Sequence, residues 1–319
     1  MSKKRTLDGF FKPIQSKQYQ PSTQTPSDHR NYPFPIPHLP PALISELGFA
    51  PTAEGKVIND QPDLDLLYFQ PYIPKEAQRE LFRFLRANLP FYRVQYTIKR
   101  AGVDVLVNTP RYTSVFGIDP TSIFSPDGEL LDAVSRVPVP KDRYMCRPRP
   151  LPACLDFLRT IVEGTTKHTY NFCLVNYYAG GEDSIAFHSD DERFLGKDPA
   201  IASLSLGARR DFFMKRKAAL PGEESVEAEP FNLPLGSGDL ILMRGPTQAK
   251  WLHSVPKRKG GESEKGRINI TFRRAMAKGG TENYYQYNVG TGRVYRWNEE
   301  DQKMVPWIAD PMSSPSSAT

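Results

Sequence analysis

Two histidines and one aspartate in this sequence have the side-chain types and spacing of ligands for a single metal ion. His188 and Asp190 are separated by one residue, and in an extended backbone such residues point to the same face of a strand. His253 lies well downstream, just after a run that we expect to be a strand. Two imidazoles and one carboxylate on a β scaffold suit non-haem Fe(II), because they leave coordination positions open for a co-substrate and oxygen.

The triad alone leaves other interpretations open. A His-x-Asp pair also occurs by chance at a surface or a turn, and the same three side chains could hold zinc or manganese. The chain has only five histidines, and two of them, His29 and His38, lie in a stretch that we expect to be disordered. The choice of iron therefore depends on a second feature.

The second feature is a run of residues, 267–273, in which polar and apolar side chains alternate. The alternation is typical of a strand with one buried face, and it puts Arg267 and Arg273 on the same side. A guanidinium binds a carboxylate through two parallel charge-assisted hydrogen bonds, so this pair suits a dicarboxylate such as 2-oxoglutarate. Asn176 and Tyr178, at the end of an apolar run, could add donors. The alternative is that residues 267–273 form an ordinary surface strand and that Asn176 and Tyr178 are ordinary polar residues at the end of another strand.

Together these residues resemble the AlkB family of 2-oxoglutarate-dependent nucleic-acid dealkylases, most closely its eukaryotic DNA-repair members. Order and spacing agree over roughly Pro150–Arg274. The matching motifs are residues 169–178, His188-Ser-Asp-Asp-Glu192, residues 201–207, Arg210-Asp-Phe212, Trp251-Leu-His-Ser254 and Arg267-x-Asn-x-Thr-Phe-Arg273. The resemblance implies a double-stranded β-helix, oxygen as the oxidant, Fe(II) bound by His188, Asp190 and His253, and 2-oxoglutarate bound by Asn176, Tyr178, Arg267, Thr271 and Arg273.

The resemblance also implies how an alkylated base is bound and repaired. Asp191 and Glu192 match an acidic pair that helps to position the base, and Arg111 matches a Pro-Arg step that can pair with Asp191. Tyr144 is our candidate for the aromatic that stacks on the base, although Cys146 stands where a further aromatic is expected. Oxidation of an N-methyl group, coupled to conversion of 2-oxoglutarate to succinate and carbon dioxide, would release formaldehyde. The expected substrates are 1-methyladenine and 3-methylcytosine in DNA.

The elements that must position these residues follow from hydrophobic periodicity. Helices are predicted over residues 74–89 and 152–163, with Gly164 ending the second. Short β-rich runs separated by turn clusters span residues 92–98, 172–177, 201–206, 211–215, 231–235, 240–244 and 267–273. This pattern predicts a mainly β fold with flanking helices, that is, a double-stranded β-helix or jelly roll.

Two features of the first half concern the bound nucleotide. A predicted hairpin over residues 92–107, with its turn at Arg100-Ala101-Gly102, lies where the family carries a nucleotide-recognition lid. Val103 and Leu106 could form a hydrophobic wedge there, filling the gap left by an extruded base, or could pack in the core. An apparent insertion, about residues 118–142, separates Arg111 from Tyr144.

Composition sets the remaining limits. The 319 residues carry a net charge of +6, with a pI of about 9.1, which fits a polyanionic partner without requiring one. Three cysteines without CxxC spacing favour a reducing compartment, and the lack of long apolar runs disfavours a membrane protein. We expect a monomer. Its parts are a disordered arm (1–61), an extension with the lid (62–150), a dioxygenase core (151–275), an aromatic-rich extension (276–310) and a flexible tail (311–319).

The arm contains one apolar cluster, Leu7, Phe10 and Phe11, spaced to form one face of a helical turn. The cluster resembles the peptide that docks onto the sliding clamp PCNA, although Lys4 replaces the usual leading glutamine. The alternative is that these apolar residues occur together by chance and bind no partner. Docking onto the clamp would place the protein in the nucleus.

The catalytic residues do not distinguish DNA from RNA. An RNA demethylase with the same core is therefore the main alternative, and the clamp-like arm is what favours DNA. A non-catalytic adaptor with a vestigial iron site agrees less well with an intact triad and two arginines. Oxidation of a protein substrate is a remoter alternative. The aromatic-rich extension suits a β-hairpin that covers the core, or a stacking surface for single strands.

Overall fold

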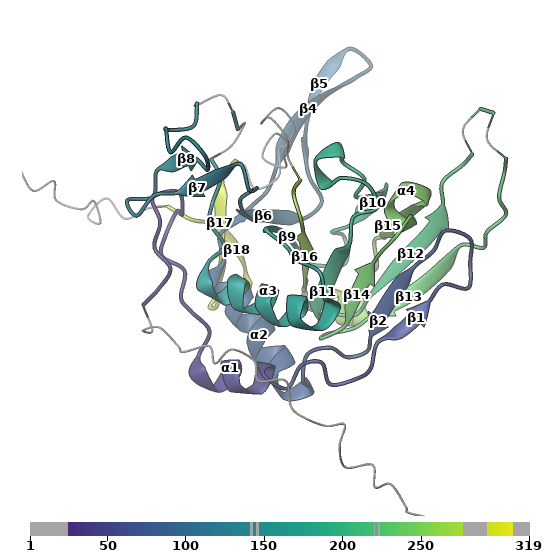
Figure 1. The fold of residues 1–319 in the computed structure, drawn as a ribbon, viewed down its shortest axis with the longest axis horizontal. Helices are drawn as coiled ribbons and strands as arrows, with labels where there is room; N and C mark the ends of the chain where they lie inside the picture. Colours follow the sequence, from purple (N-terminus) through teal and green to yellow (C-terminus); the bar gives the residue numbers. More distant parts are fainter. Residues whose placement is uncertain are drawn as a thin grey trace, which may run out of the picture.

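The body of the fold consists of a large and a small antiparallel β-sheet, with helices on one face of the large sheet (Figure 1), and the described residues also form two separate two-stranded hairpins. The computed structural model describes residues 25–140, 143–144, 147–219, 221–222, 224–276 and 292–308. The large sheet contains, in order, β1 (Lys56–Ile58), β2 (Leu66–Phe69), β14 (Leu240–Met243), β11 (Ile201–Gly207), β16 (Arg267–Arg273), β9 (Phe172–Tyr178), β6 (Tyr112–Gly117), β3 (Phe91–Tyr92), β17 (Val294–Asn298) and β18 (Lys303–Pro306). The small sheet contains β10 (Ile185–His188), β15 (Trp251–Val255), β12 (Arg210–Arg216) and β13 (Phe231–Leu235). This confirms the predicted mainly β fold with flanking helices and agrees with a jelly-roll core.

Alternation along the central strands separates a helix-facing core from a pocket-facing side. In β16, Ile268, Ile270 and Phe272 join a buried cluster with residues of α2 (Lys75–Asn88) and α3 (Ala153–Thr166). The polar residues between them face the opposite side of the sheet, where they line a pocket. The predicted strand over 267–273 is confirmed to the residue.

The two predicted helices form, with one difference at an end. The helix α2 lies within the predicted span, whereas α3 continues past Gly164 and ends at Lys167, whose φ is 60°. The prediction that Gly164 ends the helix is wrong, because the peptide N–H of Lys167 still bonds to the carbonyl of Glu163 and closes a further turn. No helix in the described ranges is long and apolar enough to cross a membrane.

The predicted disorder of residues 1–61 is wrong for the described part of this stretch. Ile36, Leu39, Leu43 and Leu47 are buried in the helix-side cluster, the last two from α1 (Pro41–Leu47). The average composition of this stretch does not reveal the packing, because its apolar residues are few. These residues nevertheless share one face, and the prolines between them reduce the conformational entropy that the chain loses on ordering. Residues 1–24 lie outside the described residues.

The predicted lid is a hairpin of β4 (Gln95–Arg100) and β5 (Val103–Asn108), which projects from the body of the molecule (Figure 1). Its turn contains Ala101 and Gly102, both with positive φ. The predicted single strand over residues 92–98 is interrupted, because Tyr92 pairs in the large sheet as part of β3.

The insertion and the C-terminal extension both form hairpins. Within residues 118–142, β7 (Ser122–Phe124) pairs with β8 (Leu130–Asp132). In the extension, β17 and β18 lengthen the large sheet, and Arg86 lies over the ring of Trp297 at 3.6 Å from its centroid. The described part of the extension thus covers the core, as the first of our two interpretations predicts; Tyr284, Tyr285 and Tyr287 lie outside the described residues.

Candidate active site

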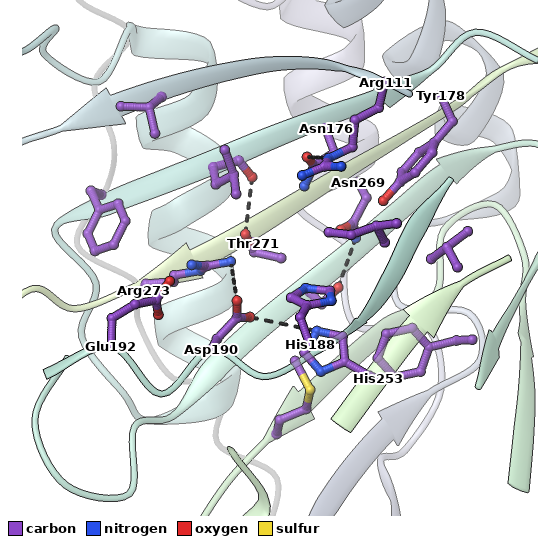
Figure 2. A pocket seen from close by; sticks show the side chains of 18 of the residues that line it. Arg111, Asn176, Tyr178, His188, Asp190, Glu192, His253, Asn269, Thr271 and Arg273 are labelled. Carbon is purple, nitrogen blue, oxygen red and sulfur yellow. Dashed lines mark hydrogen bonds and ion pairs between the residues drawn. The ribbon is translucent and has the colours of Figure 1, made fainter. Parts of the chain in front are cut away.

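His188 and His253 lie opposite each other on the paired strands β10 and β15, with ring centroids 4.2 Å apart (Figure 2). Asp190 follows β10, and its Oδ2 lies 3.9 Å from Nε2 of His253. One ligand atom from each of the three residues lies within 4.8 Å of the other two. The predicted convergence of the triad is therefore confirmed, although His253 lies within a strand rather than just after one.

Neighbouring groups orient the two imidazoles. Nδ1 of His188 lies 2.8 Å from the carbonyl oxygen of Ala186, which leaves Nε2 free to carry the lone pair. Phe212 stacks on His253 with ring centroids 5.2 Å apart and an angle of 26° between the planes. Both rings are thus held in place before any metal is bound.

The protonation states of the buried ligands suit a metal ion. Burial lowers the pKa of His253 to about 3, and the nearby His188 adds to the effect, so the imidazole is neutral at pH 7. Burial acts in the opposite sense on Asp190, but Arg273, His253 and His188 outweigh it and hold the pKa of that carboxyl below its usual value. A neutral imidazole and an ionised carboxylate are the forms that bind metals.

Arg267 fits the carboxylate of a bound acid. Its guanidinium is buried in the same pocket, one nitrogen, Nη2, donates to Oγ of Ser205 at 2.9 Å, and the ring of Tyr178 lies 5.4 Å away. Nε and Nη1 have no hydrogen-bond partner among the described residues. Burial lowers the pKa of Arg267 to about 10, which still leaves the group charged at pH 7. A buried, partly unpaired cation is costly unless an anion joins it, so 2-oxoglutarate suits this position.

Arg273 differs from the expectation of two equivalent arginines. Its Nη2 lies 2.9 Å from Oδ1 of Asp190, so in the structure it pairs with a predicted metal ligand (Figure 2). Its Nε is buried and lacks a partner among the described residues. The two arginines therefore have different surroundings, because Arg267 donates to a serine hydroxyl whereas Arg273 is paired with the carboxylate of a predicted metal ligand.

The other predicted co-substrate residues also line the pocket. Asn176 accepts a hydrogen bond from Nε of Arg111 at 3.0 Å, and Thr271 donates to the carbonyl of Leu174 at 3.2 Å. Asn269, for which we predicted no role, lies between Arg267 and Thr271 along β16 and lines the pocket with them; Figure 2 labels Asn269 and Thr271. The alternation of residues 267–273 was the signal that could have identified it. The apolar wall is formed by Val115, Phe172, Leu174, Ile185, Phe194, Phe212, Met243 and Val255.

Arg111 lines the pocket, but the predicted pair between Arg111 and Asp191 is not present. Arg111 bonds to Asn176, and Asp191 instead accepts a hydrogen bond from Nζ of Lys217 at 2.7 Å. The side chain of Asp191 is half exposed and does not line the pocket. Asp191 points away from the pocket because adjacent residues in an extended segment point in opposite directions and Asp190 already points inward.

Glu192 and Tyr144, both predicted to contact the base, are placed differently. Glu192 lines the pocket, burial raises its pKa, and its Oε2 has no partner within the described part of the chain. Tyr144 is buried outside the pocket, with its hydroxyl 2.9 Å from Oγ of Ser122 and 3.3 Å from Oδ2 of Asp119. The prediction that Tyr144 stacks on a base is wrong for this conformation, because the insertion supplies partners that bury it. Leu7, Phe10 and Phe11 lie outside the described residues.

Comparison with known proteins gives one family and several relatives. Residues 65–273 match the family described as the 2OG-Fe(II) oxygenase superfamily. The chain is 33% identical to alpha-ketoglutarate-dependent dioxygenase alkB homolog 3 of Bos taurus over a match of 237 residues. This match covers 72% of the chain and 70% of the bovine protein. It is 41% identical over 153 residues to the protein of the same name in Mus musculus, and this match covers 46% of the chain and 52% of the mouse protein.

One further relative and one solved structure were also found. The chain is 40% identical over 129 residues to DNA oxidative demethylase ALKBH2 of Homo sapiens, which covers 40% of this chain and 49% of that protein. The matches to the mouse and human proteins thus span about half of each relative. A solved structure described as "The structure of OsALKBH1" covers 69% of this chain and 100% of its own, at 15% identity and a TM-score of 0.40.

Proposed function

Because the chain belongs to the 2OG-Fe(II) oxygenase superfamily and, within it, to the AlkB family, we propose that it oxidatively removes alkyl groups from nucleic-acid bases. One observation carries the proposal. A single pocket contains three convergent metal ligands, His188, Asp190 and His253, together with a buried arginine, Arg267, whose donors are largely unpaired.

Each part of the pocket has a distinct task in this reaction. When bound, Fe(II) and 2-oxoglutarate supply the oxidising power that hydroxylates the alkyl group with oxygen. The triad holds the metal, and Arg267 and Asn176 bind and orient the co-substrate on the large sheet. The apolar wall excludes water from the reacting atoms.

We propose that the substrates are 1-methyladenine and 3-methylcytosine in DNA, repaired by direct reversal. Both lesions carry a positive charge. Such a base would stabilise the carboxylate of the partly buried Glu192, whose buried Oε2 lacks a partner among the described residues. The human relative is a DNA oxidative demethylase by name, and this likeness supports the choice of DNA in our proposal. An RNA demethylase with the same pocket is the alternative that the experiment must exclude.

We propose further that the β4–β5 hairpin contacts the duplex. Val103 and Leu106 are 64% and 61% exposed, so the interpretation that they pack in the core is wrong. Exposed apolar side chains on a projecting hairpin suit a wedge that fills the gap left by an extruded base.

The activity is tested with the full chain, Fe(II), ascorbate and 2-oxoglutarate. Methylated single-stranded DNA, duplex DNA and RNA are supplied in separate reactions, and loss of the methyl group is followed by mass. We expect His188→Ala to abolish turnover and His168→Ala, a matched change outside the pocket, to leave it intact. Equal activity of both variants would remove the metal assignment, and turnover on RNA alone would remove the DNA assignment.

The N-terminal arm supports a separate proposal. We propose that Leu7, Phe10 and Phe11 dock onto the sliding clamp PCNA and that the protein therefore works in the nucleus. The double variant Phe10→Ala with Phe11→Ala should weaken clamp binding, whereas Tyr19→Ala, another aromatic of the arm, should not. Turnover on short oligonucleotides should be unchanged in both. Unaltered clamp affinity in the double variant would refute the docking.

A further inference from the structure

Gln248 is a buried amide that touches the metal-binding loop from outside the pocket. Its Oε1 accepts a hydrogen bond from the backbone N–H of Asp190 at 2.8 Å, and its Nε2 donates to Sδ of Met243 at 3.0 Å. Only 1% of the residue is exposed. The amide therefore has one strong and one weak partner, and the strong one belongs to a predicted metal ligand.

Gln248 also lies on the element that leads to a second ligand. It belongs to the short helix α4 (Thr247–Lys250), which continues directly into β15 and His253 (Figure 1). The backbone carbonyl of Gln248 accepts a hydrogen bond from Nζ of Lys217 at 3.0 Å, and the same ammonium bonds to Asp191 at 2.7 Å. The loop that carries Asp190 is thus tied at two adjacent residues to the turn that precedes His253.

The helix α4 is itself fixed to the large sheet. Oγ1 of Thr247 accepts a hydrogen bond from the backbone N–H of Asp65 at 2.9 Å and lies 3.2 Å from the carbonyl of the same residue. Arg244 bonds to the carboxylate of Asp65 at 2.6 Å. These contacts hold α4 beside the start of β2 but do not involve Asp190.

We propose that Gln248 is a positioning residue that sets the distance between the carboxylate of Asp190 and the imidazole of His253. The inference rests on the metal-binding role proposed for those residues. The physical reason is that the N–H of Asp190 is buried and must be paired, and Gln248 is the partner that fixes the backbone from which the carboxylate projects. Groups that orient metal ligands in this way typically change metal affinity by about 10–100-fold when they are removed.

Two substitutions separate the hydrogen bond from the packing. Gln248→Met keeps the length of the side chain and removes the acceptor, whereas Gln248→Glu keeps an oxygen that can accept the N–H of Asp190. Thr247→Val breaks the neighbouring bond to Asp65 without touching Asp190, so it reports on the stability of α4 alone. Affinity for Co²⁺, chosen as an oxygen-stable probe, is measured on each full-length variant, together with the absorption spectrum of the bound ion.

We expect the dissociation constant for Co²⁺ to rise about tenfold or more in Gln248→Met and to stay within about threefold of wild type in Gln248→Glu. The spectrum of the bound Co²⁺ should shift in the first variant only, and Thr247→Val should lower the unfolding temperature without changing the dissociation constant. Wild-type affinity in Gln248→Met, or equal weakening in Thr247→Val, would overturn the inference. Failure of the wild-type protein to bind Co²⁺ would overturn the metal site and this inference together.

A measurement on the wild-type protein covers the case in which Gln248→Met does not fold. If Gln248 holds the N–H of Asp190, that amide should exchange with deuterium far more slowly than an unprotected amide. Exchange of this amide at the unprotected rate would refute the proposed role of Gln248 without any substitution.

Discussion

At the scale of single residues, the charge of Arg267 favours binding of the co-substrate but lowers the stability of the ligand-free protein. Its charge is buried on β16, and two of its three nitrogens lack a partner among the described residues. Such a group destabilises the free protein, because its desolvation is only partly compensated. A carboxylate that enters the pocket removes the deficit, so part of the free energy of co-substrate binding is relief of this destabilisation.

Arg267→Met should separate the two effects. We expect the KM for 2-oxoglutarate to rise at least about tenfold, because hydrogen bonds to charged groups contribute about 1.5–3 kcal/mol. The unfolding temperature of the ligand-free protein should not fall. Succinate release at varied 2-oxoglutarate gives the first quantity and thermal unfolding the second. Arg159→Met makes the same change in a surface ion pair of α3 and should leave KM unaltered; an unchanged KM in Arg267→Met would exclude it from the co-substrate site.

The predicted site residues that the structure brings together in the pocket share one property. His188, Asp190 and Arg267 lie in strands or beside them, and the two-residue period of a strand determines which side chains face together. The partners of Arg111 and Tyr144 depend instead on which distant segments of the chain pack beside them. These partners, Asn176 and Ser122, are set by the packing of distant segments and an insertion, which no local pattern encodes.

At the scale of elements, the β4–β5 hairpin and the N-terminal segment have opposite surroundings. The hairpin exposes Val103 and Leu106, whereas the segment before β1 buries Leu43 and Leu47. Apolar residues on the first element are therefore available for a ligand, and those on the second stabilise the fold.

For the hairpin, Val103→Ser with Leu106→Ser should reduce turnover on duplex DNA several-fold and affect short single strands much less, because only a duplex leaves a gap to be filled. Unfolding temperature should barely change, since both side chains are exposed. Asp104→Ser, between the two positions, serves as the control for the same experiment. Equal losses on both substrates would argue against a wedge.

For the N-terminal segment, Leu43→Ala should lower the free energy of unfolding by about 2–5 kcal/mol, as for other buried leucines. Glu46→Ala, on the exposed side of α1, should change it by less than about 0.5 kcal/mol. Urea denaturation measures both. If the two variants unfold at the same urea concentration, the segment does not contribute to the core.

The strands and helices of the core were predictable and this segment was not, for a physical reason. The strand β16 and the helix α2 each show their own period over a continuous run, so local sequence is sufficient. Residues 25–61 contribute a few apolar side chains from the short helix α1 and from the irregular segments around it. Their burial depends on a surface supplied by α2 and α3, which a reading of local composition does not include.

At the scale of the whole molecule, the two sheets divide the proposed ligands between them. The metal ligands come from β10, β15 and the loop after β10, whereas Arg267 and Asn176 come from the large sheet. A molecule bound at one end to the metal and at the other to Arg267 would therefore join the two sheets.

This division predicts that metal and co-substrate stabilise the protein cooperatively. In thermal unfolding, Mn²⁺ with 2-oxoglutarate should raise the midpoint by more than the sum of the two separate shifts, because each ligand improves the site of the other. Arg267→Met should keep the shift with Mn²⁺ and lose the excess. Strictly additive shifts in the wild-type protein would show that the two sites are independent.

The pairing of His188 with His253 across β10 and β15 also limits how the chain can change in length. One residue added to or deleted from β15 would turn His253 to the outer surface, while the backbone could still pair in a shifted register. Such an indel would also displace the buried Trp251 and Val255, so it would disturb the core as well as the metal ligands. Duplications and deletions are therefore compatible with activity only in the connections, and the segment from 118 to 142 lies in one of these.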